Sequence, residues 1–365
     1  MRVLMLSTDS NMLDTSSRVY RRTRAYADLV ESIVVVLVGS GQAFDRTDGK
    51  VRVIRFAASN KIVALFALWF QLPAFAWSEK IDIVTTQDPL WCGLLGVRVK
   101  QKNRIPLQVQ IHTDFRNPQY MHESLMRRIE SVLPPYVLRR ASSVRIVSER
   151  MRADAERLSR APVRTLPVMI DVDSDGVTAR PSEYGAYPIA LMVCRLVREK
   201  NVAVAIEALS TLSDMHLYIV GDGPLRATLE EKARVSGVAH RVHFLGWKQT
   251  VRPYFEHASC FLSLSAYEGY GLSLAEAALF GCPIIATDAG LAGAELRDQE
   301  HVTLVNAHKY DVRMALKSVV ENAEAASVRA RAARAAIESV RLPPAVYAER
   351  YVGLLSECLL DTMHR

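Results

Sequence analysis

Short runs of aliphatic residues alternate with longer stretches of mixed polarity in the first half of the chain. The apolar runs span residues 2–6, 33–38, 51–56, 81–85, 107–111 and 143–147. Helical patterns lie between them, such as 17–30 and 125–139, the second of which is interrupted at Pro134 and Pro135. Strands that are apolar throughout and separated by helices are typical of a parallel sheet covered on both faces.

A second series of the same kind follows a polar, turn-rich segment. Its apolar runs span residues 188–193, 215–220, 241–245, 259–264, 283–286 and 302–304. We therefore predict an α/β protein with two doubly wound, Rossmann-like domains, at 1–170 and 188–342, joined by a linker at 171–187. A last helix, 343–365, is expected to pack back on the first domain. The carboxyl ends of the strands would face a central cleft, where ligands of such sheets bind.

Composition agrees with a globular protein in a reducing compartment. The chain has 365 residues, of which 50% are apolar and 23% charged, so disorder is not expected. Its five cysteines are scattered and form no Cys-x-x-Cys pair, which argues against a zinc site and against a disulfide framework. Buried, reduced thiols and a cytoplasmic location follow.

Two apolar segments could be mistaken for membrane or targeting signals. The first residues turn polar too soon for a signal peptide and instead predict a strand. The longest apolar stretch, 62–77, contains Gln71 and Pro73 and falls short of the roughly 20 residues that span a bilayer. We interpret it as an apolar helix, which either belongs to the interior or contacts a membrane surface through its aromatic residues.

The net charge of +7 comes mainly from clustered arginines. The clusters are Arg18, Arg21, Arg22 and Arg24; Arg127, Arg128, Arg139 and Arg140; and Arg329, Arg331 and Arg334. Solvated helix faces would explain them, as would attraction to an anionic membrane surface or to phosphorylated ligands. No nucleic-acid-binding motif accompanies the charge, so nucleic acid is not an expected partner.

The segment after the apolar run 259–264 has the residues of an anion site. Glu268 and Glu276 flank a Gly-Tyr-Gly turn, and the second glutamate lies in the first turns of a predicted helix. A strand, a glycine turn and a helix start direct backbone N–H groups at an anion. The two carboxylates are suited to accept hydrogen bonds from hydroxyl groups, as a diphosphate with a sugar at each end would require.

Two further strand ends carry candidate ligand-binding residues. Arg195 follows the run 188–193, and Lys200 comes five residues later, before a helical stretch; the pair is either an anion clamp or two surface cations. Gly221 and Gly223 form a turn that lets a ligand approach the backbone or serves as a tight turn alone. The third glycine of a nicotinamide-binding motif is replaced by Arg226, which argues against a dehydrogenase.

Taken in order, these residues resemble the donor-binding domain of GT-B-fold glycosyltransferases, most closely family 4, whose members are retaining enzymes that use nucleotide sugars. The matching segments are Arg195-x4-Lys200, 220–225, 244–246, Glu268-x7-Glu276, 281–283 and 286–290 with Glu295. The resemblance implies that Arg195 and Lys200 bind the donor diphosphate. It further implies that Glu268, Gly269, Tyr270, Gly271 and Leu272 hold the sugar and phosphate, that Gly221 and Gly223 approach the donor, and that Glu276 binds the ribose.

The first half resembles the family more loosely. His112 follows the run 107–111, as does the family's histidine at the cleft, which implies contact with the transferred sugar; Asp114 would orient it or meet the acceptor. The glycine pair that many relatives have after the first strand is missing. Ser17 and Arg18 would then take over that role on the acceptor side.

The resulting hypothesis is a hexosyltransferase-type enzyme that moves a sugar to a glycan or lipid-linked saccharide with retention of configuration. No carboxylate nucleophile is evident, so attack on the same face as the departing phosphate is expected. Neutralisation of that phosphate by Arg195 and Lys200 would make a metal or other cofactor dispensable. A nucleotide-sugar epimerase or hydrolase and a non-catalytic sugar-nucleotide-binding protein remain alternatives.

Overall fold

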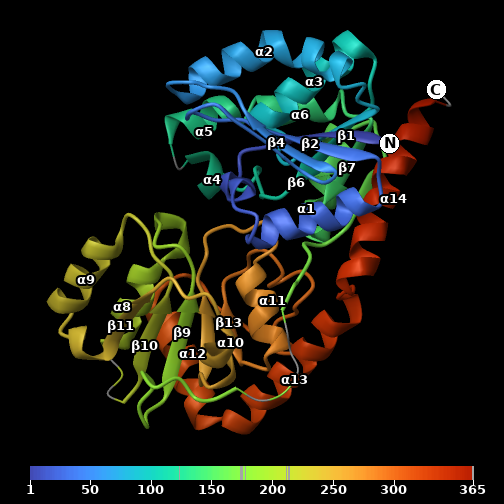
Figure 1. Ribbon diagram of the computed structural model, residues 1–365. Coiled ribbons are helices and arrows are strands. Elements are labelled where there is room, and N and C mark those ends of the chain that lie inside the picture. The colour runs from blue at the N-terminus through green and yellow to red at the C-terminus, as the bar shows by residue number, and fades with distance from the viewer. Residues whose placement is uncertain (123, 173–175, 177, 211, 213, 364–365) are drawn as a thin grey trace. The chain divides into compact units, whose positions relative to one another are not determined.

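The computed structural model describes residues 1–122, 124–172, 176, 178–210, 212 and 214–363. The chain forms two compact units (Figure 1), and each contains one largely parallel sheet with helices packed on it. Unit 1 comprises Met1–Asp171 and Leu342–Arg365, and unit 2 comprises Val172–Arg341. The prediction of two doubly wound α/β domains is therefore confirmed.

Unit 1 contains an eight-stranded sheet in the order β3-β4-β2-β1-β5-β6-β7-β8. The strands are β1 (Arg2–Ser7), β2 (Ser32–Leu37), β3 (Phe44–Asp48), β4 (Val51–Arg55), β5 (Ile83–Thr86), β6 (Leu107–Ile111), β7 (Ser143–Ile146) and β8 (Val163–Thr165). All neighbours are parallel except β3 and β4, which pair antiparallel at one edge. The pattern of apolar runs missed β3 and β8, because both are short edge strands with few buried residues.

The helices of unit 1 cover this sheet and include the last helix of the chain. They are α1 (Arg18–Asp28), α2 (Lys61–Ser78), α3 (Trp91–Asn103), α4 (Pro118–His122), α5 (Leu125–Glu130), α6 (Leu133–Leu138), α7 (Arg152–Leu158) and α14 (Pro344–Met363), with short 3-10 helices at Ser10–Leu13 and Glu149–Met151. The helical stretch predicted to be interrupted at Pro134 and Pro135 forms two helices, α5 and α6, but the break comes at residues 131–132 and both prolines lie in the first turn of α6.

Helix α14 packs on α1 through aromatic rings. The rings of Tyr26 and Tyr351 stack with centroids 4.2 Å apart, and Tyr347 lies against the same ring at 6.3 Å. All three side chains are buried in the core of unit 1. Stacked aromatic pairs add to the free energy gained from burying their surface, so α14 is an integral part of this unit.

Unit 2 contains a six-stranded parallel sheet in the order β11-β10-β9-β12-β13-β14. The strands are β9 (Ile189–Val193), β10 (His216–Val220), β11 (Val242–Gly246), β12 (Cys260–Ser263), β13 (Ile284–Ala286) and β14 (Thr303–Leu304). The helices are α8 (Val202–Leu209), α9 (Arg226–Val235), α10 (Arg252–Glu256), α11 (Leu272–Leu279), α12 (Lys309–Glu321) and α13 (Ala323–Val340), with 3-10 helices at Arg198–Lys200 and Ala239–Arg241. Each predicted apolar run of this half coincides with one of these strands, and only β11 extends one residue beyond its run.

The segment predicted as a linker packs on unit 2 where it is described. Tyr184 is buried and donates a hydrogen bond from its hydroxyl to the carbonyl of Tyr254 (3.1 Å). Thr178 donates from its backbone N–H to the carboxylate of Glu256 (3.1 Å). Residues 173–175 and 177 of the predicted linker lie outside the described residues.

Two glycines of unit 2 allow close contact between the loops that follow β9 and β10. A Cβ atom on Gly221, whose φ is +129°, would lie 2.0 Å from the carbonyl oxygen of Cys194. A Cβ atom on Gly223 would lie 2.6 Å from the carbonyl oxygen of Leu196. Neither contact can be relieved by a side-chain rotation, because the opposing atoms are backbone.

Replacing Gly221 by alanine should therefore destabilise unit 2 more than replacing a glycine that has only an unusual φ. Gly237 provides the control, since its φ is +71° but no atom lies within 4 Å of its would-be Cβ. We expect Gly237→Ala to lower the free energy of unfolding by about 1 kcal/mol, and Gly221→Ala by clearly more. Urea unfolding followed by circular dichroism measures both, and equal losses would contradict the close backbone contact.

Candidate functional site

The loops at the carboxyl edge of the unit 2 sheet are tied together by backbone hydrogen bonds. The N–H of Ala266, after β12, donates to the carbonyl of Glu199, after β9 (2.8 Å). The N–H of Leu196 donates to the carbonyl of Asp222, after β10 (2.9 Å). The segments predicted to bind a diphosphate sugar are thus brought together at one edge, as the carboxyl ends of parallel strands require.

Lys200 and Glu268 form an ion pair at this edge, between Nζ and Oε1. The hydroxyl of Ser265 donates a second hydrogen bond to the same carboxylate oxygen (2.8 Å). Only 17% of the Lys200 side chain and 19% of the Glu268 side chain are exposed, so solvent screens this pair less than a surface ion pair. The cation predicted to bind the diphosphate and the carboxylate predicted to hold the sugar and phosphate therefore contact each other.

Arg195 is placed differently from Lys200. Its side chain is 78% exposed, and its guanidinium lies 3.8 Å from the carboxylate of Glu199. The two cations of the predicted clamp thus pair with different carboxylates. Lys200 is held in place, whereas Arg195 extends into solvent from the same loop.

The turn before α11 directs backbone N–H groups outward from the sheet edge. Gly271 has a left-handed conformation (φ 85°), and its carbonyl accepts the N–H groups of Leu274 (2.9 Å) and Ala275 (3.2 Å). The preceding N–H groups belong to the first turn, which forms the positive end of the helix dipole. Ser273 fixes this helix start by donating its hydroxyl to the carbonyl of Val193 (2.8 Å).

Glu276 lies on the next turn of α11 and is buried, with 7% of its surface exposed. The turn of Gly269, Tyr270 and Gly271 is held on its other side by the loop after β13. The N–H of Leu291 donates to the carbonyl of Tyr270 (2.9 Å), and a Cβ atom on Gly290 would lie 2.6 Å from the same oxygen. Both glutamates therefore lie on backbone that neighbouring loops hold in place.

Unit 1 has a cavity of about 320 Å³ at the carboxyl ends of its strands. It is lined by Met5, Thr8, Asp9, Arg22, Thr23, Tyr26, Gln87, Asp88, Gln110, His112, Thr113, Arg145, Val168, Tyr347 and Tyr351. Of the residues predicted for the acceptor side, His112 lines this cavity, whereas Ser17, Arg18 and Asp114 do not. Arg145 was not a predicted ligand-binding residue, and Arg22 was predicted only as a member of an arginine cluster that could attract an anionic membrane or phosphorylated ligands.

The contacts of His112 define which nitrogen holds its proton. Nε2 lies 3.0 Å from Oε1 of Gln110, while Nε2 of Gln110 donates to Thr85 (2.9 Å) and to the hydroxyl of Tyr351 (2.8 Å). The amide oxygen of Gln110 must therefore accept, so His112 holds its proton on Nε2 and has Nδ1 as an acceptor. Burial lowers the pKa of His112 well below its usual range, and the positive charges of Arg145 and Arg22 lower it further.

Ser17 has a structural role in the folded protein. Its hydroxyl accepts the N–H of Tyr20 (3.1 Å) at the start of α1 and donates to the carbonyl of Asn11 (2.7 Å). These are the contacts of a helix N-cap. Asp114 is committed to a loop, where it accepts the N–H of Arg116 (3.2 Å), and burial raises the pKa of its carboxyl.

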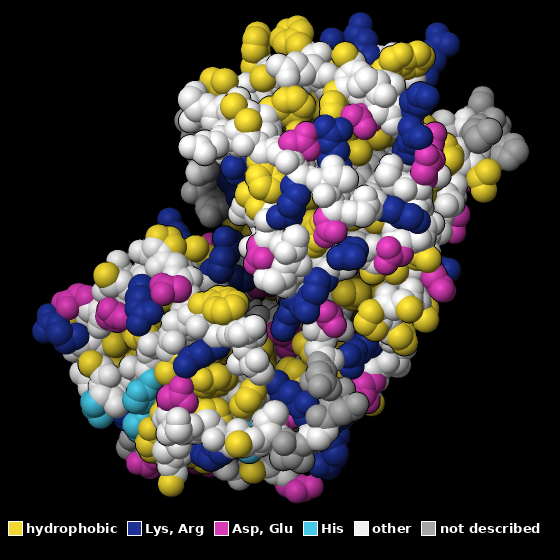
Figure 2. All heavy atoms as spheres, viewed as in Figure 1, with side chains coloured by type: hydrophobic (Ala, Val, Ile, Leu, Met, Phe, Trp, Pro, Cys, Tyr) yellow, Lys and Arg dark blue, Asp and Glu magenta, His cyan; other side chains and the backbone are white. Residues whose placement is uncertain are grey.

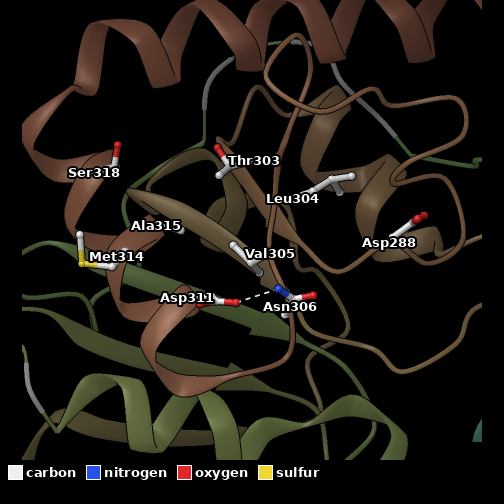
Figure 3. A pocket seen from close by; sticks show the side chains of 9 residues that line it. All are labelled: Asp288, Thr303, Leu304, Val305, Asn306, Asp311, Met314, Ala315 and Ser318. Carbon is white, nitrogen blue, oxygen red and sulfur yellow. Dashed lines mark hydrogen bonds between the residues drawn. The ribbon is translucent and has the colours of Figure 1, made fainter.

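A second cavity, of about 570 Å³, lies beside β14 and α12 in unit 2 (Figure 3). Its charged lining residues are Asp288 and Asp311, and the side chain of Asp311 accepts a hydrogen bond from Asn306 (2.9 Å). An acidic lining repels a diphosphate, so this cavity is a poorer candidate than the edge that contains Lys200. Among the described residues, no group of three or more His, Cys, Asp or Glu side chains is arranged to hold a metal ion.

His112 should stay neutral at a pH where an ordinary histidine is charged. Because its pKa is lower in the folded than in the unfolded chain, the folded state binds fewer protons below about pH 6.5, and stability is lost as the pH falls. His112→Gln keeps a donor for Gln110 but cannot titrate. We expect the wild type to lose more free energy of unfolding than this variant between about pH 7 and about pH 5. Equal losses in urea unfolding, or an imidazolium signal of His112 in nitrogen NMR above about pH 6.5, would contradict the assignment.

Comparison with known proteins agrees with this geometry. A family model described as "Glycosyl transferases group 1" matches residues 187–322, and one described as "Glycosyl transferase 4-like domain" matches residues 15–169. The chain is 27% identical over 299 residues to the 2-deoxystreptamine glucosyltransferase of Streptomyces kanamyceticus, covering 76% of this chain and 72% of that protein. It is 30% identical over 119 residues to LpsE, a lipopolysaccharide core biosynthesis glycosyltransferase of Rhizobium meliloti.

The match to LpsE covers 33% of this chain and spans only 35% of that relative's length. Among solved structures, the Anabaena protein HepE in complex with UDP and glucose superimposes with a TM-score of 0.77 at 19% identity, over 98% of this chain and all of that one. The shared fold and the two domain matches in this order show that the chain is a glycosyltransferase of the GT-B fold that resembles family 4.

Proposed function

We propose that the protein transfers a sugar from a nucleoside diphosphate sugar to a saccharide acceptor, which is either a glycan or a lipid-linked saccharide. The observation that supports this most directly is the Lys200–Glu268 ion pair beside the start of α11, where a cation, backbone N–H groups and a carboxylate lie together. The related Anabaena structure contains UDP and glucose, which supports a donor of this class.

The proposed mechanism begins with an exchange of partners when the donor binds. The diphosphate replaces Glu268 as the ion-pair partner of Lys200 and lies against the N–H groups at the start of α11. Glu268 can then accept a hydrogen bond from a sugar hydroxyl. Negative charge grows on the leaving diphosphate as its bond to the sugar breaks, and a fixed cation and oriented N–H groups stabilise it. Arg195, exposed on the same loop, would move onto the diphosphate, and Glu276 would bind the ribose.

Retention of configuration is part of the proposal. The acceptor hydroxyl attacks the face from which the diphosphate departs, and a phosphate oxygen takes its proton. His112 contacts the transferred sugar through the unprotonated Nδ1, which can accept a hydrogen bond from a hydroxyl. No metal is needed, because Lys200 and the helix start neutralise the leaving group.

An epimerase or hydrolase on the same fold is the competing enzyme class, and a non-catalytic sugar-nucleotide-binding protein is the other alternative. Release of free nucleotide that requires an added saccharide supports transfer, and release without one indicates hydrolysis. Sugar-nucleotide binding without any turnover would indicate the non-catalytic alternative. Screening nucleotide sugars by thermal shift selects the donor first, since a ligand that binds only the folded state raises its apparent stability. Proton NMR of the product's anomeric signal then reports retention or inversion.

Lys200→Gln and Glu268→Gln should each lower kcat/KM for the donor by about a hundredfold or more, because each removes a group that stabilises the transition state. The assay measures nucleotide release in the presence of EDTA, since the proposal requires no metal. Arg198→Gln is the matched control, because Arg198 is an exposed cation of the same 3-10 helix. It should retain activity within about twofold.

Full activity of both Lys200→Gln and Glu268→Gln would contradict the proposed site. Thermal unfolding of each variant shows whether a loss of activity reflects the site or the fold. Glu268→Gln can still accept the hydrogen bond from Ser265, so its fold is expected to persist.

We also propose that unit 1 contacts an anionic membrane from the cytoplasmic side, through α2. Only a narrow strip of this helix is buried, namely Ala64, Leu68, Leu72 and Ala76. The opposite side exposes large apolar residues: Ile62 (77%), Phe66 (69%), Phe70 (58%) and Trp77 (75%). By length and composition α2 could cross a bilayer, but its buried strip packs within unit 1, which favours a helix lying on the membrane surface.

Figure 2 shows hydrophobic side chains over α2, and basic side chains lie beside them in unit 1. Helix α5 extends the face with exposed Met126 and Ile129 and contributes Arg127 and Arg128. Lys61 connects the two helices, since its ammonium lies 3.7 Å from the buried carboxylate of Glu130. The sequence of α2 contains no acidic residue, so the exposed charge of this face is positive and complements anionic lipid.

Trp77→Ser should weaken binding to vesicles that contain phosphatidylglycerol by about tenfold, since a tryptophan at the interface gains free energy by leaving water. Trp247 of unit 2 is the matched control, because its side chain is equally exposed (76%) but belongs to no such face. Vesicle flotation measures both variants. Equal loss in the two, or binding to neutral vesicles as strong as to anionic ones, would contradict the proposal.

A further inference from the structure

The cavity of unit 1 contains two arginines that the proposed transfer reaction does not use. Arg145 lies on β7 and is 3% exposed, and Arg22 lies on α1 and is partly buried. Both line the same space as His112. Arginine presents several N–H donors in a planar fork and keeps its charge at all physiological pH values, which suits it to bind phosphate or carboxylate.

Arg145 is buried, and no carboxylate of the described residues forms an ion pair with it. Its guanidinium donates to Oε1 of Gln110 (2.6 Å), to the carbonyls of Leu166 (3.0 Å) and Pro167 (3.1 Å) and to the hydroxyl of Tyr347 (2.6 Å). These partners satisfy the N–H donors of the guanidinium. All of them are uncharged, so they do not neutralise its positive charge. An uncompensated charge in a site of low dielectric attracts anions strongly.

Arg22 also lines this cavity and adds a second positive charge to it. Among the described residues, none forms an ion pair with Arg22. The side chain projects from the second turn of α1, whose start, capped by Ser17, lies after the first strand. Arg22 therefore places a second guanidinium at this cavity, from a helix on another side than β7.

The two acidic residues that line the cavity are engaged with backbone N–H groups. Asp9 accepts the N–H of Asn11 (3.0 Å), and Asp88 accepts those of Leu90 (2.8 Å) and Cys92 (3.2 Å). Burial raises the pKa of Asp88, and a carboxyl group that holds its proton more readily repels a bound anion less. Burial lowers the pKa of His112, and the positive charges of Arg145 and Arg22, which line the same cavity, lower it further.

We propose that this cavity binds an anionic group, a phosphate or a carboxylate, of the saccharide acceptor, with Arg22 as the contacting residue and Arg145 as a buried source of positive charge. Its volume of about 320 Å³ lies at the lower end of the range for small-molecule sites and suits a monosaccharide phosphate. The assignment to the acceptor rests on the proposed transferase function, whereas binding of the anion does not.

Glucose 6-phosphate and glucose form a matched pair of probes, since they differ in one phosphate. The reporter is the imidazole signal of His112, identified by its loss in His112→Gln. Both sugars are titrated into the full-length protein, with and without saturating UDP to occupy the donor site. Arg22→Gln is compared with Arg21→Gln, which removes the same charge from an exposed position on the same helix.

We expect glucose 6-phosphate to shift the signal and glucose to bind at least about tenfold more weakly, with UDP leaving both results unchanged. Arg22→Gln should weaken glucose 6-phosphate binding by about tenfold, Arg22→Lys by less, and Arg21→Gln should have no effect. Equal affinity for the two sugars, no shift with either, or equal loss in Arg22→Gln and Arg21→Gln would overturn the anion site. Displacement of glucose 6-phosphate by UDP would overturn the acceptor assignment.

A failure of UDP to bind unit 2 would count against the proposed transferase function alone. The response of His112 to glucose 6-phosphate would then still test the anion site. The two proposals can therefore fail separately.

Discussion

The site in unit 2 depends on loops that touch through their backbones with no side chains between them. The loop after β10 lies so close to the loop after β9 that Gly221 and Gly223 have no room for a Cβ atom, and Gly290 meets the turn before α11 in the same way. These contacts hold the Lys200 loop and the Glu268 turn each against a neighbouring loop, and the hydrogen bond from the N–H of Ala266 to the carbonyl of Glu199 joins the two. Even replacement of one of these glycines by alanine would therefore displace charged side chains that the new methyl group does not contact.

The cations at the two candidate sites, Lys200 in unit 2 and Arg145 in unit 1, have different kinds of partner. In unit 2, Lys200 is paired with Glu268, so the cation is stabilised until a ligand replaces the carboxylate. In unit 1, Arg145 has only neutral partners, so its charge acts on the cavity at all times. A paired cation gives a site whose contacts change on binding, whereas an unpaired buried cation gives a site that is already complementary to an anion. Both arrangements suit anionic ligands. Binding in unit 2 must first break the Lys200–Glu268 ion pair, whereas binding in unit 1 leaves the contacts of Arg145 as they are.

The sequence predicted the fold well because the fold depends on local signals, and the same signals located the loops of unit 2 that contain the donor-site candidates. Apolar runs located the strands of both sheets except the edge strands β3 and β8, and the Gly-Tyr-Gly turn located the start of α11 with Glu276 on it. The side-chain partners were not predictable, because hydrogen bonds and ion pairs depend on geometry that spacing does not encode. Ser17 was predicted to bind ligand but caps α1, and Arg195, predicted as half of a clamp, is exposed beside Glu199.

The cavity of unit 1 was the least predictable feature, because its walls come from the two ends of the chain. Arg145 needs acceptors for its N–H groups, and one of them, the hydroxyl of Tyr347, comes from α14. Tyr351 of the same helix accepts from Gln110, which in turn accepts from both Arg145 and His112. The last helix therefore does more than cover the core: it supplies the polar groups that allow a charged guanidinium to be buried beside a neutral histidine. A chain that lacked α14 would leave a buried N–H group of Arg145 without this acceptor, which would make burial of the guanidinium more costly.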